Sequence, residues 1–120
     1  MSHIVEIQLK LRDRDAVRAA CQRLNLPEPV HGTAELFSGQ ATGLLIQLPG
    51  WHYPAVVDTE LGTVQYDNYG GVWGEQARLD CFLQAYAVVK ARLEARKKGF
   101  AVHEQTLADG SIQLFIQEGY

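Results

Sequence analysis

Apolar and polar side chains alternate over residues 3–11, and a helical pattern follows at once. The two alternating sets are His3, Val5, Ile7, Leu9 and Leu11 against Ile4, Glu6, Gln8 and Lys10. A period of two indicates a half-buried strand. Asp13 can cap a helix, because its carboxylate can accept a free backbone N–H, and apolar residues recur at helical spacing over 17–24. Asn25 and then Pro27 end this helix.

The middle of the chain, residues 33–69, consists of short apolar segments separated by turn residues. This arrangement is typical of β-strands. The pattern predicts four strands, at 34–37, 42–48, 53–58 and 63–66. Glu60-Leu61-Gly62 forms a hairpin turn between the last two strands. Pro54 indicates that the third strand starts there or lies at an edge, because proline cannot donate to a ladder.

The longest predicted element is a helix over residues 75–98. Its apolar stripe consists of Leu79, Phe82, Leu83, Tyr86, Val89 and Leu93. Lys97 and Lys98 lie at the negative end of the helix dipole, and Gly99 can adopt the conformation that ends a helix. Two further strands are predicted at 100–106 and 111–117, on either side of an Ala-Asp-Gly turn.

The element order is therefore β-α-β-β-β-β-α-β-β in a single domain spanning residues 1–120. Strands and helices that are segregated in this way predict an α+β fold. We expect a mostly antiparallel sheet with two helices on one face.

The bulk composition changes this picture little and excludes some classes of function. The chain has a net charge of −3, with 47% apolar and 21% charged residues. An acidic balance argues against binding DNA, whose phosphates require a basic surface. No apolar run approaches a membrane span, and no signal peptide is apparent, so we expect a cytoplasmic protein. Cys21 and Cys81 lie on apolar helical stripes and are expected to be buried thiols.

The candidate site is the aromatic and glycine-rich segment from residue 51 to residue 73. Pairing of the third and fourth strands brings its two aromatic groups to the same end of one hairpin, a surface suited to a ring-shaped ligand or a protein partner. The alternative is that the rings only pack over the end of the core, with glycines supplying turn conformations. The candidate binding residues are Trp51, His52, Tyr53, Tyr66, Asp67, Asn68, Tyr69 and Trp73.

Motifs of catalysis, phosphate binding and metal binding are missing. The glycines at 70–74 lack the Lys-Ser/Thr of a P-loop, and no serine has the context of a nucleophile elbow. His52 and Asp67 could form an acid–base pair, but such a pair is common by chance, so no catalytic residue is assigned. The histidines lack ligand spacing, although Met1-Ser2-His3 could chelate copper or nickel if Met1 is kept. We assign no metal site, and no motif indicates a cofactor.

Three stretches of the chain are distinctive: the Met-Ser-His start, LPGWHYPAVVDTELGTVQYDNYGGVWG at residues 48–74, and the basic end of the long helix with the hairpin after it. The residues of this last motif are Glu94, Ala95, Arg96, Lys97, Lys98, Gly99, Phe100, Asp109, Gly110 and Ser111. The first and last stretches resemble a family of unknown function, the hypothetical chloroplast reading frame thirty-five proteins of plastids and cyanobacteria, and the middle one is similar to the bacterial relatives of that family, so the resemblance spans nearly the whole chain. Proteins of this family are neighbours of an AAA-type ATPase, so the resemblance implies a role in a multi-protein assembly. It implies no catalytic residue.

These observations favour a non-catalytic binding or adaptor module that contacts a protein partner through the aromatic segment. A small-molecule-binding protein or small enzyme that uses the same aromatic pocket is the second hypothesis. The third is a structural subunit that forms a homo-oligomer through a sheet edge or an apolar helix face.

Overall fold

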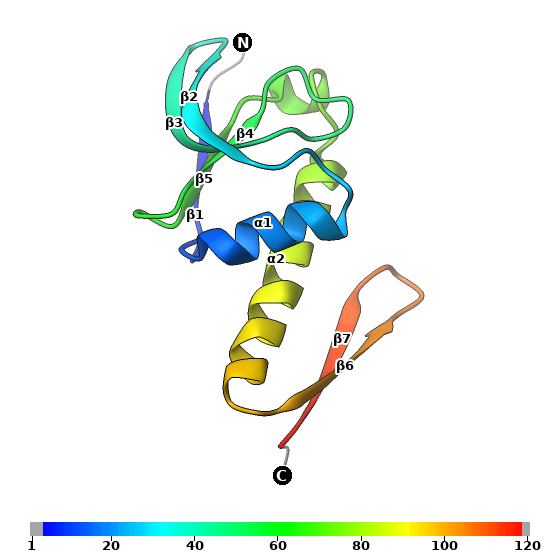
Figure 1. Ribbon diagram of the computed structural model, residues 1–120. Helices are drawn as coiled ribbons and strands as arrows, with labels where there is room; N and C mark the ends of the chain where they lie inside the picture. Colours follow the sequence, from blue (N-terminus) through cyan, green and yellow to red (C-terminus); the bar gives the residue numbers. More distant parts are fainter. Residues whose placement is uncertain (1–3, 119–120) are drawn as a thin grey trace.

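The computed structural model describes residues 4–118 and confirms the predicted α+β class and element order (Figure 1). The predicted start of the first strand at His3, and the possible Met1-Ser2-His3 chelate, lie outside the described residues. The elements are β1 (Val5–Gln8), α1 (Arg14–Arg23), β2 (Val30–Leu36), β3 (Gly39–Ile46), β4 (Ala55–Asp58), β5 (Thr63–Tyr66), the 3₁₀ turn η1 (Tyr69–Gly71), α2 (Gln76–Lys97), β6 (Ala101–Thr106) and β7 (Ile112–Gln117).

Five strands form one antiparallel sheet in the order β1-β5-β4-β3-β2. The register pairs Val5 with Tyr66 and Val57 with Val64. Both helices cover the same face of this sheet, as predicted, and bury the main core against it. Its largest fully buried side chains include Phe82, Ile46, Leu79, Val17, Val57 and Val64.

The strands β2 and β3 curl over the opposite face of the sheet (Figure 1). A second, smaller core forms there from Ala34, Leu36, Ala41 and Val56. Gly43 allows the close approach of β3 and β4, because a Cβ at this position would lie 2.4 Å from the carbonyl oxygen of Val57. A Cβ at Gly39 would lie 3.3 Å from Ile4 Cδ1, so the turn between β2 and β3 curls toward the strand at the far edge.

The start of α1 is bound to α2 through Asp13. As predicted, Asp13 is the N-cap: its Oδ1 accepts a hydrogen bond from the backbone N–H of Ala16 at 3.1 Å. Its Oδ2 accepts from Lys90 of α2 at 2.9 Å. The hydrogen bond from Lys90 lowers the pKa of the Asp13 carboxyl. The cap therefore fixes the start of α1 and its position on α2 together.

The C-terminal strands β6 and β7 form a separate two-stranded sheet instead of joining the larger one. This hairpin lies beside the C-terminal half of α2, beyond the edge of the main sheet (Figure 1). Its Glu104 accepts hydrogen bonds from Arg23 of α1 and Arg92 of α2. The molecule is elongated as a result, with a radius of gyration of 15.3 Å, compared with about 14 Å for a compact domain of this length.

Three details differ from the prediction. The second strand begins at Val30, and Phe37 lies in the turn after it with its ring exposed. The next predicted strand, 42–48, is instead β3 over Gly39–Ile46. Cys81 is exposed, whereas Cys21 is buried as expected. Cys81 lies on the side of α2 away from the buried Leu79 and Phe82.

Candidate functional site

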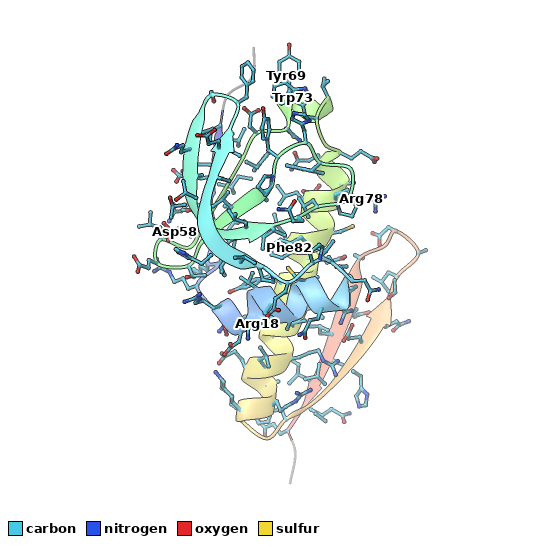
Figure 2. The ribbon with its side chains drawn as sticks, turned by 45° about the horizontal axis from the view of Figure 1, so that its top comes forward. Arg18, Asp58, Tyr69, Trp73, Arg78 and Phe82 are labelled. Atoms are coloured by element: carbon cyan, nitrogen blue, oxygen red, sulfur yellow. The ribbon has the colours of Figure 1, made fainter. Side chains whose placement is uncertain are left out.

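The side chain of Trp73 is the centre of an aromatic cluster at one end of the sheet. We define the aromatic cluster as Phe37, His52, Tyr53, Tyr69 and Trp73. Tyr69 stacks on Trp73 with ring centroids 4.9 Å apart, and Phe37 lies at 5.3 Å. His52 and Tyr53 each lie 5.6 Å from Trp73. Figure 2 shows Tyr69 and Trp73 together at one end of the molecule, whereas Arg18 of α1 lies near its middle.

A tight turn after β5 brings Tyr69 and Trp73 together. Asp67 Oδ1 accepts a hydrogen bond from the Tyr69 N–H at 3.2 Å. The carbonyl oxygen of Asn68 accepts from the N–H groups of Gly71 at 3.0 Å and Trp73 at 2.9 Å. Tyr69 has a φ of 49° and Gly71 a φ of 101°. A left-handed conformation at a tyrosine is uncommon and costs free energy, so the surrounding hydrogen bonds must hold it in place.

Trp51 lies beneath the cluster and joins the loop before β4 to the start of α2. Its indole packs flat against Gly74, where an added Cβ would lie 2.5 Å from the ring. The indole Nε1–H donates to the carbonyl oxygen of Glu75 at 3.0 Å. The ring also contacts Tyr66 edge-on, with centroids 5.7 Å apart. Gly74 is therefore required by the close approach of an aromatic ring.

Asn68 completes the framework from inside. Its Nδ2 donates to the carbonyl oxygen of Gly74 at 3.1 Å and to Oε1 of Gln76 at 3.2 Å. The backbone N–H of His52 donates to the carbonyl oxygen of Trp73 at 2.7 Å. The loop before β4, the turn after β5 and the first turn of α2 thus form one hydrogen-bonded unit under the rings.

The outer side of this unit exposes large apolar side chains. The exposed fractions are 63% for Phe37, 40% for Tyr69 and 71% for the neighbouring Val72. His52 is exposed as well, while Tyr53 and Trp73 are half-buried. Single exposed apolar residues are normal on protein surfaces. Several such residues in contact with one another form a patch of the kind found at binding surfaces.

The eight residues predicted as a site are brought to one end of the hairpin, but they divide into two groups. His52, Tyr53, Tyr69 and Trp73 belong to the aromatic cluster, and Trp51 supports it from below. Tyr66, Asp67 and Asn68 are buried. These three can shape the site but cannot contact a partner directly.

Sequence reasoning missed Phe37 and Val72. Phe37 comes from the β2–β3 turn, far along the chain from Trp73, and only the curvature of the sheet brings the two rings together. An apolar ring within the turn Phe37-Ser38-Gly39 was the available signal, because turn residues are usually polar. Val72 lies inside the segment that was singled out, and its exposure follows from the conformation of the preceding glycines.

Among residues 4–118, the side chains of Asp67 and His52 are not joined by a hydrogen bond. The Asp67 side chain is 1% exposed, and Oδ2 has no hydrogen-bond partner among the described residues. His52 packs edge-on against Tyr53, with centroids 4.6 Å apart. Within residues 4–118, no group of three or more His, Cys, Asp or Glu side chains converges to hold a metal ion.

None of the helices in residues 4–118 combines the length and apolar character needed to cross a membrane. The resemblance to the plastid and cyanobacterial reading-frame family stays a prediction. Comparison of the chain with family profiles, with curated proteins and with solved structures found no match.

Proposed function

We propose that this chain is a small non-catalytic binding or adaptor module that contacts a protein partner through the aromatic cluster and Val72. The observation that carries the proposal is the exposure of Phe37, Tyr69 and Val72 around the half-buried Trp73. Aromatic side chains that are held rigidly lose little conformational entropy on binding, and they dominate the energy of many protein interfaces.

The packing of the rings favours a protein partner over a ring-shaped small molecule. Tyr69 and Trp73 are already stacked in van der Waals contact, with centroids 4.9 Å apart. A flat ligand therefore cannot insert between them and would have to lie on the outside of the cluster. A protein surface can cover all the exposed side chains at once, which excludes water from each of them.

The resemblance to the reading-frame family adds a candidate partner, an AAA-type ATPase, within a multi-protein assembly. The cytoplasm is the proposed location, since both cysteines are free and a reducing compartment preserves free thiols. Neither point depends on the geometry of the site.

The test uses a photo-cross-linking amino acid placed at position 37, where the side chain is exposed. The matched control is position 61, because Leu61 is a similarly exposed apolar residue on the β4–β5 turn. The probe is introduced into the protein in its host cells, and the adducts are identified by mass spectrometry. We expect one protein to be cross-linked from position 37 and not from position 61, and the adduct to disappear in a Tyr69→Ala variant.

Equal cross-linking from the two positions, or an adduct unaffected by Tyr69→Ala in a folded variant, would contradict the proposal. The small-molecule hypothesis makes a different prediction. It requires a ligand that raises the melting temperature of the wild-type protein and not that of Tyr69→Ala.

A further inference from the structure

One side of α2 is only partly covered by the other described elements: Leu9 and Leu11 border it on one flank and Phe100 and Ile116 on the other. The stripe on this side comprises Asp80, Leu83, Ala87, Ala91, Glu94 and Lys98, which recur at helical spacing. Ala87 is exposed, and Leu83 and Ala91 are half-buried. Figure 1 shows β6 and β7 on one side of the lower half of α2 and no element on the other. We call this surface the open stripe.

The open stripe borders an apolar hollow of about 520 Å³. Leu9 and Leu11, in the segment between β1 and α1, form one wall, and Leu83, Ala87 and Ala91 form the other. Two alanines four residues apart allow the backbone of a neighbouring helix to approach closely, because their side chains are small. The shape and chemistry of the surface therefore suit a second helix.

The charges at the two ends of the open stripe indicate which second helix would pack against it. Asp80 and Lys98 are 18 residues apart, or about five helical turns, so they lie on the same side of α2. Both are exposed, and Lys98 makes no ion pair within residues 4–118. Glu94, the third charged residue of the stripe, is already paired with Lys90 and Lys97 of the same helix. The charges of the stripe without an ion pair among residues 4–118 are thus an acidic one at one end and a basic one at the other, which is complementary to an antiparallel copy of the helix.

We propose that two copies of this chain associate through the open stripe, with their α2 helices antiparallel. A two-fold axis across the open stripe, at the level of Val89 along α2, places Asp80 against Lys98 of the second copy, and the symmetry repeats this pair. The same axis places Ala87 against Ala91 of the second copy, where the helices cross. A parallel arrangement would place like charges together, so the charges select the antiparallel one.

The dimer is independent of the partner proposed for the aromatic cluster. None of the residues of the aromatic cluster belongs to the open stripe. The dimer would thus present two aromatic clusters, one on each copy, and both would remain available to a partner.

A charge swap tests the proposal by sedimentation equilibrium or light scattering at low salt. The wild-type chain is expected at about twice its mass of 13.4 kDa. Asp80→Lys and Lys98→Asp should each raise the dissociation constant tenfold or more, because each creates two like-charge contacts. The double variant Asp80→Lys/Lys98→Asp restores both pairs and should restore the wild-type mass.

Two further variants separate the interface from general effects of charge. Ala87→Glu places a carboxylate at the helix crossing and should give a monomer. Arg78→Glu is the matched control, since Arg78 is exposed and its position two residues before Asp80 places it on another side of α2. It should leave the dimer intact, and circular dichroism checks that each variant is folded.

A wild-type monomer at 100 µM would overturn the proposal. A folded Ala87→Glu variant that stays dimeric would do the same, and so would a double charge variant that fails to recover the dimer while each single variant is monomeric.

Discussion

Replacement of Gly74 by alanine should destabilise the protein by displacing Trp51. The three heavy atoms nearest to an added Cβ all belong to the Trp51 indole, at 2.5–2.7 Å. Ordinary van der Waals contact begins near 3.5 Å. The ring must therefore move by about 1 Å, and it cannot do so without lengthening the hydrogen bond from its Nε1–H to Glu75, which is 3.0 Å long.

The loss in free energy of unfolding caused by Gly74→Ala has two contributions. Overpacking by a single methyl group costs about 1–3 kcal/mol, and loss of the indole hydrogen bond costs about 1 kcal/mol. The free energy of unfolding should thus fall by about 2–4 kcal/mol. For a domain of this length, about 1 kcal/mol corresponds to about 4 °C in melting temperature, so we expect a decrease of about 8–16 °C.

The assay is thermal and urea unfolding, followed by far-UV circular dichroism. Gly32→Ala is the matched control, because a Cβ at Gly32 would meet its nearest atom, Leu45 Cδ1, at an ordinary contact distance of 3.7 Å. A double-mutant cycle makes the test specific. In a Trp51→Ala background the added methyl group has space, so Gly74→Ala should cost less than about 1 kcal/mol there.

The explanation would be refuted by a Gly74→Ala variant as stable as Gly32→Ala. It would also be refuted if the cost of Gly74→Ala were the same with and without the indole of Trp51, because the clash would then lie elsewhere.

Three other predictions can be tested on the same material. A thiol reagent should label Cys81 alone in the native protein and both thiols in urea, because Cys21 is buried and desolvation raises its pKa to about 11. Gly43→Ala should lower the urea midpoint by more than Gly74→Ala, since its Cβ would lie 2.4 Å from a backbone carbonyl oxygen that cannot rotate away. Glu104→Gln should increase hydrogen exchange in β6 and β7 at pH 7, because the hydrogen bond from Arg23 is the main cause of the lowered pKa of the Glu104 carboxyl. A lowered folded-state pKa contributes stability above the usual value of 4.5 that is lost as pH falls, so wild type and Glu104→Gln should converge under acid conditions.

Features set by local chemistry could be predicted from the sequence. Asp13 caps α1, and Gly99 takes the positive φ that follows the end of α2. The hairpin turn at Glu60-Leu61-Gly62 forms where it was expected, and its pairing brings the two aromatic groups together. Each of these depends on residues within a few positions, or on the pairing of adjacent strands.

Features set by the packing of distant segments could not be predicted. The contact between Phe37 and Trp73 requires the curl of the whole sheet. Cys81 was expected in the core because its position fits an apolar helical pattern. However, α2 packs against the sheet, α1 and the hairpin β6–β7 at different points along its length, so no single stripe describes its buried side. The burial of Asp67 and Asn68 likewise depends on how the turn after β5 folds back on α2.

The helix α2 joins the two ends of the molecule. Its first turn is bonded to Trp51 and Asn68 below the aromatic cluster, and its last turns hold the hairpin β6–β7. A helix of 22 residues is about 33 Å long. A tilt of about 10° at the first turn would therefore displace the far end by about 6 Å. The distance between the aromatic cluster and the hairpin is therefore set by one continuous helix, and the contacts of α2 with α1 and the core oppose such a tilt.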